Sequence, residues 1–298
     1  MSKATIVNGN YPPSVGERLG KAIILTVVSL AVILPFVGII STSLAPASQI
    51  NDSGGFVLFP KSVDWSAYRS ILSGGVVTRA LVISVGVTAV GTVLSLACTA
   101  LLAWALSRRG TVANRPMLLL LLFSLLFSPG LIPVYLAVQQ FGLIDSLWSL
   151  IVPSMISAFN VIVVRSFFVA LPGELIDSAR IDGAGEWQVF RYIALPLSRP
   201  VLAVIGLFYA VSYWNAFFNA LLYINNATNW PLQLVLRTYV VNGTQLGSAD
   251  LGAISEAVPP QISVQMAILV ISIIPILLVY PFVQKHFTKG VLTGAVKG

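Results

Sequence analysis

Charged residues are scarce in this chain of 298 residues, where they make up only 9% of the sequence. Soluble globular proteins carry about 25% charged residues, so the composition excludes a water-soluble fold. Hydrophobic residues make up 57% of the chain. The sequence therefore indicates one polytopic membrane protein rather than two soluble domains.

Histidine and cysteine are equally rare, with one residue of each, His286 and Cys98. A single histidine leaves no room for a multi-histidine metal site or a histidine-based catalytic triad. Cys98 has no partner for an internal disulfide. We therefore expect no catalytic residue, no metal site and no cofactor bound by this chain, and we predict that it is not an enzyme.

Six uncharged stretches reach or approach the length of about 20 apolar residues that a helix needs to cross a bilayer. They are Ala22–Ser43, Ala80–Ser107, Met117–Val138, Ser146–Val164, Val201–Tyr223 and Gln261–Gln284. Four contain a proline (Pro35, Pro133, Pro153 and Pro275), which a bundle tolerates because neighbouring helices satisfy the freed carbonyl groups. The first stretch exceeds the apolar region of a signal peptide, about 7 to 15 residues, so we interpret it as a retained helix. The sequence predicts an all-α, polytopic transmembrane bundle with six membrane-spanning helices.

Lysine and arginine are distributed unequally over the two sides of this six-helix topology. Thirteen lie on the side of both termini, and four, Lys61, Arg69, Arg79 and Arg237, lie on the other. Positive residues favour the cytoplasmic side, so both termini are predicted to be cytoplasmic. The predicted parts are a cytoplasmic N-terminus at residues 1–21, a transmembrane domain at 22–284 and a cytoplasmic tail at 285–298. Because topology accounts for most of the net charge of +7 and no basic run is interleaved with aromatics, we expect the lipid bilayer and no nucleic acid as a partner.

The connection between the fourth and fifth stretches, residues 165–199, holds eight charges and is called the polar loop below. Pro172 suits the first turn of a helix, and Glu174 and Asp177 near that N-terminus complement the helix dipole. The glycines at 183 and 185 are predicted to end this helix at Ala184. A solvated surface loop is the alternative interpretation.

A second short amphipathic helix is predicted in the polar loop. It places Trp187, Phe190 and Ala194 on one side before Pro196 breaks it. A helix, a glycine turn and a second helix that are too polar to span a membrane can lie across the mouth of the bundle. There they can contact a cytoplasmic partner.

Two further connections, residues 45–79 and 224–260, are long, polar and aromatic. Aromatic residues are typical of the membrane boundary. These predicted outer loops either face a soluble outer partner or merely connect helices.

The polar loop carries a resemblance to a known family. The motif consists of Glu174-Leu175, Asp177-Ser178-Ala179, Asp182-Gly183-Ala184, Phe190, Ile193, Leu195-Pro196-Leu197 and Pro200. This order resembles the EAA loop of binding-protein-dependent ABC importer permeases, and most of all the second permease subunit of maltose-type and oligosaccharide importers. The match extends over the six stretches and the tail. One departure is that Asp177-Ser178-Ala179 replaces the family's Glu-Ala-Ala, so the acidic side chain is one methylene shorter.

The resemblance implies a permease subunit of an ATP-driven ABC importer in a bacterial cell membrane. It implies a second homologous permease subunit in a heterodimer, two ATPase subunits that bind the ATP and Mg, and an extracytoplasmic solute-binding protein that delivers a carbohydrate. The polar loop would be the coupling helix, which transmits ATPase closure into alternating access. The coupling residues carried over from the family are Glu174, Asp177, Ser178, Ala179, Asp182, Gly183, Ala184, Leu195 and Pro196.

Polar side chains in the predicted pathway lie mainly in the fifth stretch. They are Tyr209, Tyr213, Asn215 and Asn219, with Asn160 in the fourth stretch as a further candidate. Asn215 and Asn219 are four residues apart, so a continuous helix would place them on one face. Amides and aromatic rings suit sugars, while packing between helices is the alternative role.

The sequence also bears on other membrane functions. A secondary transporter would carry ionisable residues deep in its spans, and none lies deep in these six. An enzyme would need a clustered acid, base or metal site, and the sequence contains none. A permease for a different polar solute and a non-transporting assembly subunit stay open. The outer arginines, Arg69, Arg79 and Arg237, suit an acidic oligosaccharide, but topology alone also explains them.

Overall fold

The computed structural model describes residues 15–108, 110, 113–244, 247, 250 and 259–295. These residues form helices and turns with no strand among them, which confirms the predicted all-α class. The chain divides into two compact units: Met1–Ser70 with Ser255–Val270, and Ile71–Ile254 with Ile271–Gly298. Residues 1–14 of the predicted N-terminus and 296–298 of the predicted tail lie outside the described residues.

Three helical segments are long and apolar enough to cross a membrane: Val15–Ser43, Val76–Ser107 and Gln261–Val279. Two bent helix pairs raise the number to as many as five among the described residues. One pair, Trp148–Ser154 with Ala158–Val169, bends by 52°, and the other, Glu186–Leu197 with Arg199–Trp214, bends by 81°. A membrane helix bundle is thus supported, and the number of six spans stays a prediction.

The first unit contains α1 (Val15–Ser43), α2 (Ala47–Asp52), most of α3 (Ser66–Leu72) and the beginning of α15 (Gln261–Ala295). The end of α1 is tied to the loop that follows it. Thr42 Oγ1 accepts a hydrogen bond from Val57 N (3.0 Å) and donates to Val57 O (3.2 Å), and the hydroxyls of Ser43 and Tyr68 lie 2.7 Å apart. The segment after α1 is therefore folded onto the helix end rather than extended.

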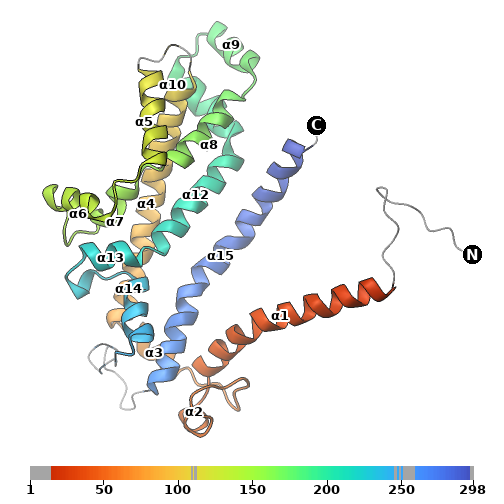
Figure 1. The fold of residues 1–298 in the computed structure, drawn as a ribbon, viewed down its shortest axis with the longest axis vertical. Helices are drawn as coiled ribbons and strands as arrows, with labels where there is room; N and C mark the ends of the chain where they lie inside the picture. Colours follow the sequence, from red (N-terminus) through yellow and green to blue (C-terminus); the bar gives the residue numbers. More distant parts are fainter. Residues whose placement is uncertain are drawn as a thin grey trace, which may run out of the picture. The chain divides into compact units, whose positions relative to one another are not determined.

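The second unit is built around α4 (Val76–Ser107), which packs against α12 (Arg199–Trp214) and α8 (Ala158–Val169). The helices α9 and α10 lie toward one end of α4. The helices α13 and α14 lie along the half of α4 that is farther from α9 (Figure 1). The bounds of the other elements are α5 Asn114–Leu126, α6 Leu131–Gln140, α7 Trp148–Ile151, η1 Val152–Ser154, α9 Gly173–Ile181, α10 Glu186–Val189, η2 Phe190–Ala194, α11 Leu195–Leu197, α13 Phe217–Tyr223, η3 Ala227–Asn229, α14 Leu232–Leu236 and η4 Arg237–Val241.

The predicted third span is interrupted, so its continuity was wrong. It consists of α5 and α6, separated by Phe127-Ser128-Pro129-Gly130. Gly130 has φ +84°, a conformation that favours glycine, and Pro129 provides no N–H for a helical bond. Pro133 lies in the first turn of α6, where its missing N–H costs nothing.

The fourth and fifth predicted spans are also interrupted. In the fourth, Pro153 lies in the short 3-10 helix η1, and α8 begins only at Ala158 after Ser157 caps it. In the fifth, α12 ends at Trp214 and α13 begins at Phe217. The carbonyl of Val211 accepts the last backbone bond of α12, from Asn215 N at 3.1 Å, and a second bond from Asn215 Nδ2 at 2.9 Å.

Two tyrosine hydroxyls join α12 to α4 and to the interrupted fourth span. Tyr209 Oη lies 2.7 Å from Thr99 Oγ1 and accepts a bond from Ser157 N at 3.1 Å. Tyr213 Oη lies 2.7 Å from Ser95 Oγ and donates to Ile151 O at 3.3 Å. Backbone groups freed by the break between α7 and α8 thereby find partners inside the unit, as a hydrocarbon environment requires.

Asp145 joins two loops that are distant in the sequence. Its Oδ1 accepts bonds from Asn225 N (3.1 Å) and Asn226 N (2.9 Å), and its own N–H donates to Tyr223 O at 2.7 Å. Asp145 has φ +61°, a conformation that is uncommon outside glycine but is adopted by Asp more readily than by most residues. The loop before α7 and the loop after α13 are therefore fastened together.

Candidate functional site

The first helix of the polar loop, α9, ends in a tight turn at Gly183. Gly183 has φ +82°, its N–H donates to Arg180 O (3.0 Å), and the N–H of Ala184 donates to Ala179 O (2.9 Å). This pair of bonds is a Schellman motif, which requires a left-handed residue just past the helix end. The predicted glycine turn is confirmed at this residue.

The predicted end of this helix at Ala184 was wrong. The helix ends at Ile181, and Asp182 is its cap, because the left-handed conformation of Gly183 already turns the chain there. Pro172 directly precedes the helix instead of lying in its first turn.

The second helix of the polar loop is continuous from Glu186 to Leu197, so the predicted break at Pro196 was also wrong. It includes a wider π-helical segment at Phe190–Ala194. Pro196 lies in the first turn of the next α-helical segment, where its missing N–H is tolerated. The bend comes later, at Ser198, before α12 begins.

Arg180 joins the two helices of the polar loop. Its guanidinium forms an ion pair with Asp177 on α9 (3.7 Å) and a second one with Glu186 at the start of α10. The hydrogen bond and the charge of Glu186 raise the pKa of Arg180. These pairs are exposed, so they orient the helices more than they stabilise them.

Aromatic rings anchor the polar loop to the core of the second unit. The rings of Phe168 and Phe190 lie 5.5 Å and 5.6 Å from the ring of Trp104. The guanidinium of Arg108 stacks on Trp104 with its central carbon 3.6 Å from the ring centroid. Burial lowers the pKa of Arg108, and the charge of Glu186 acts against that shift. Trp104 and Phe168 were not among the predicted site residues; the available signal for Trp104 was an aromatic residue near the end of a predicted span.

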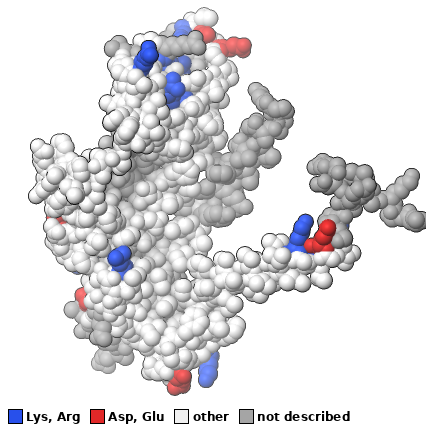
Figure 2. All heavy atoms as spheres, in the orientation of Figure 1, with Lys and Arg blue, Asp and Glu red and all other residues white. Residues whose placement is uncertain are grey.

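The predicted coupling residues lie mostly on the surface of this anchored element. Glu174, Asp177, Ser178, Asp182 and Gly183 are exposed, and Ala179, Ala184, Leu195 and Pro196 are half-buried. Large apolar side chains are exposed beside them, including Ile181 (87%), Tyr192 (69%) and Trp187 (61%). Figure 2 shows that charged side chains gather at the end of this unit that carries α9 and α10.

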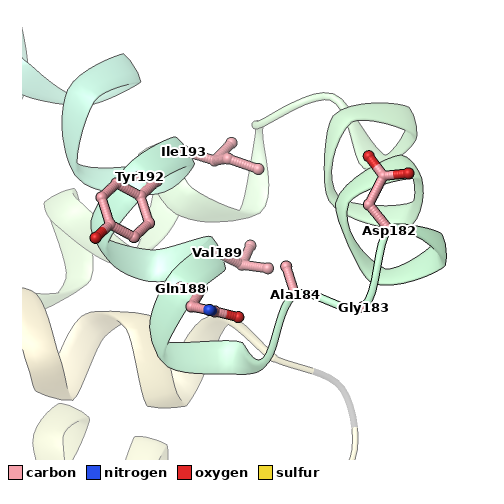
Figure 3. Close-up of a pocket in the computed structure, with 7 residues that line it drawn as sticks. All are labelled: Asp182, Gly183, Ala184, Gln188, Val189, Tyr192 and Ile193. Atoms are coloured by element: carbon pink, nitrogen blue, oxygen red, sulfur yellow. The ribbon is translucent and has the colours of Figure 1, made fainter.

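A pocket of about 280 Å³ opens between the glycine turn and the second helix of the polar loop. Its lining is Asp182, Gly183, Ala184, Gln188, Val189, Tyr192 and Ile193 (Figure 3). Gln188 is held there by a bond from Gly185 N to its Oε1 at 2.8 Å. A polar element with exposed rings and a shallow pocket is suited to contact another protein.

The predicted pathway residues differ in how deeply they are buried. Tyr209 and Tyr213 are buried, 3% and 4% exposed, with their hydroxyls bonded inside the unit. Asn160 is buried on the first turn of α8, and Asn219 is half-buried on α13. Asn215 is exposed at the break between α12 and α13. The prediction that Asn215 and Asn219 share one helical face was wrong, because the helix is interrupted between them.

The second unit also contains a cation–π contact that was not predicted from the sequence. The guanidinium carbon of Arg237 lies 5.1 Å from the ring centroid of Phe217, the first residue of α13. Arg237 begins the π-helical segment η4.

The polar loop lies within the part of the chain that matches a known family. A family model described as "Binding-protein-dependent transport system inner membrane component" matches residues 95–293. Over 276 residues the chain is 43% identical to the polygalacturonan/rhamnogalacturonan transport system permease protein YtcP of Bacillus subtilis (strain 168), covering 92% of this chain and 96% of that protein. It is 46% identical to protein LplC of the same organism, covering 89% of this chain and 90% of that protein.

A solved structure is similar over nearly the whole chain. It is a subunit of a bacterial ABC transporter involved in the import of the acidic polysaccharide alginate. The TM-score is 0.84 at 29% identity, with 93% of this chain and 100% of that chain covered.

Proposed function

Since the chain belongs to the family of binding-protein-dependent transport system inner membrane components, we propose that it forms half of the translocation pathway of an importer for acidic oligosaccharides. The chain is the membrane permease component of a sugar ABC importer, and ATP is hydrolysed by a separate subunit. The remaining parts of the proposal concern the substrate, the coupling and the assembly.

The substrate proposal rests on the similarity of this chain to two proteins that are named after the transport of acidic polysaccharides. One is the polygalacturonan/rhamnogalacturonan permease, and the other is a subunit of the alginate importer. Galacturonate units carry a carboxylate on each ring. Cations on this chain would complement such units, and neutral sugars would need none.

The coupling proposal rests on the polar loop. Its exposed apolar residues, its pocket and its aromatic anchor on Trp104 support a role as the docking element for an ATPase subunit. A helix pair packed onto the bundle at one end and onto an ATPase at the other would move as a rigid body. Glu174, Asp177 and Gly183 are the residues that we expect closest to that partner.

The assembly proposal comprises a second permease subunit, two ATPase subunits and an outer binding protein. We also propose that the chain crosses the membrane of a bacterial cell six times, with both termini in the cytoplasm. The helical tail that continues α15 to Ala295 would reach toward the ATPases.

Reconstitution tests the proposed function. The chain is placed in proteoliposomes alone, and with its second permease, the ATPase pair and the binding protein. We expect ATP-driven uptake of trigalacturonate only by the complete complex. Uptake by the chain alone would contradict the importer mechanism. If the complex takes up a neutral trisaccharide but not trigalacturonate, the substrate is a neutral sugar instead. If the subunits copurify but transport neither sugar, the chain is better explained as an assembly subunit.

A further inference from the structure

Arg237 is a charge in an apolar helix. The helical segment Leu232–Val241 contains no other Asp, Glu, Lys or Arg, in a chain that is only 9% charged. The side chain of Arg237 is exposed, and among the described residues no carboxylate lies within ion-pair distance of it. An ionisable residue in such a segment is costly in contact with lipid, so it faces either water or a partner group.

The backbone fixes the position of Arg237. Leu232, Leu234 and Val235, one turn earlier, are 0%, 2% and 0% exposed. The N–H of Leu232 donates to Ser84 Oγ of α4 at 2.7 Å, and Thr238 Oγ1 donates to Leu234 O at 2.9 Å. The charge is thus presented from a rigid element, and π-helical segments such as η4 are frequent at functional sites.

The contact with Phe217 brings Arg237 to the break between α12 and α13. Phe217 follows the two non-helical residues Asn215 and Ala216, and its N–H donates to Asn215 O at 2.8 Å. Interrupted backbone at membrane depth is tolerated where it is buried in protein or lines a water-filled cavity. Asn215 is exposed on this chain, which favours the cavity.

The contact of the Arg237 guanidinium with the Phe217 ring, together with the amide of Asn215 two residues before Phe217, has the chemistry of an acidic sugar site. A guanidinium binds a carboxylate with two parallel N–H···O bonds. An aromatic ring offers a face to the C–H groups of a pyranose, and an amide bonds to its hydroxyls. Resting on the proposed function, we infer that Arg237, held over Phe217 next to Asn215, binds the carboxylate of a uronate unit in the pathway and selects acidic over neutral oligosaccharides.

The test uses the complete importer in proteoliposomes with one binding protein throughout. Four forms are compared: wild type, Arg237→Gln, Arg237→Lys and Arg79→Gln. Arg79 is the matched control, because it is another of the outer arginines, exposed in the same unit on the first turns of α4, and its removal changes the net charge equally. The inference gives the carboxylate to Arg237 and explains Arg79 by topology, so the comparison separates one binding residue from the general charge of that side. The probes are trigalacturonate and its methyl ester, which has the same sugar rings and linkages without the charges.

We expect Arg237→Gln to lower kcat/KM for trigalacturonate about tenfold, which corresponds to about 1.4 kcal/mol. Uptake of the methyl ester should stay unchanged, Arg237→Lys should restore part of the loss, and Arg79→Gln should behave as wild type. Equal loss for both probes would assign Arg237 to a contact with another subunit and overturn the inference. So would an equal effect of Arg79→Gln, or trigalacturonate uptake unaffected by Arg237→Gln. If the wild-type complex transports no trigalacturonate, the proposed substrate class fails instead. If the ester is not transported at all, trigalacturonate uptake alone tests the inference. The inference then requires that Arg237→Gln lowers this uptake, that Arg79→Gln does not, and that Arg237→Lys restores part of it.

Discussion

Replacement of Gly91 by alanine tests the packing of α4 against α12. A Cβ at Gly91 would lie 2.8 to 2.9 Å from three carbon atoms of the Tyr213 ring. Carbon atoms in contact prefer about 3.5 to 4.0 Å, so the ring must move by roughly 0.6 Å or more. The ring is held at its far end, because the Tyr213 hydroxyl is bonded to Ser95 and Ile151. We therefore expect an overpacking cost of about 1 to 3 kcal/mol.

Two other glycines provide matched controls for this substitution. A Cβ at Gly206, on the facing helix α12, would lie 3.5 Å from Leu96 Cδ2, an ordinary contact, and a Cβ at Gly86 would meet nothing within 4 Å. Alanine favours a helix over glycine by up to about 1 kcal/mol, so Gly206→Ala and Gly86→Ala should be neutral or slightly stabilising.

The assay is thermal unfolding of the purified importer complex in detergent. Gly91→Ala should lower the transition by a few degrees, since about 1 kcal/mol corresponds to roughly 2 to 4 °C in proteins of 150 to 250 residues. In a Tyr213→Leu background the same change should cost less, because the ring carbons are gone. If Gly91→Ala were as stable as Gly206→Ala, the close approach of the two helices described above would be incorrect.

The remaining predictions concern coupling and the pathway. Gly183→Asp should abolish the stimulation of ATP hydrolysis by loaded binding protein, because φ +82° strains any side chain there and the added bulk would project from the docking surface. Asp177→Ala removes one exposed ion pair, which contributes little, and should cause only a partial loss. Full stimulation in Gly183→Asp would show that the polar loop is not the coupling element. Asn215→Leu should impair sugar uptake while the subunits still copurify, and normal uptake would assign Asn215 to packing.

The sequence was sufficient for the helical class and for the glycine turn of the polar loop. Apolar length identifies membrane helices because lipid forces the backbone to satisfy its own polar groups. Gly183 was recognisable because few other residues adopt the left-handed conformation at a helix end.

The interruptions of the predicted spans were harder to foresee. Asn215 is one polar residue in a mostly apolar stretch, and one such residue does not predict that a helix ends there. The carbonyl of Val211 accepts both the backbone N–H and the side-chain amide of Asn215, an arrangement that no sequence pattern reveals. The partners of Tyr209 and Tyr213 lie more than 50 residues away, so no local pattern distinguishes these tyrosines from pathway residues. The stacking of Arg237 on Phe217 likewise joins two elements through tertiary structure alone.

The fastening of two loops by Asp145 limits where this chain can be lengthened. Residue 145 and residues 225–226 are held by the same carboxylate oxygen, so a tag or inserted peptide in either loop strains both. Insertions are best accepted where the backbone is exposed and makes few bonds. Fluorescent or affinity labels therefore belong away from this junction, and a change in the length of one loop would need a compensating change in the other.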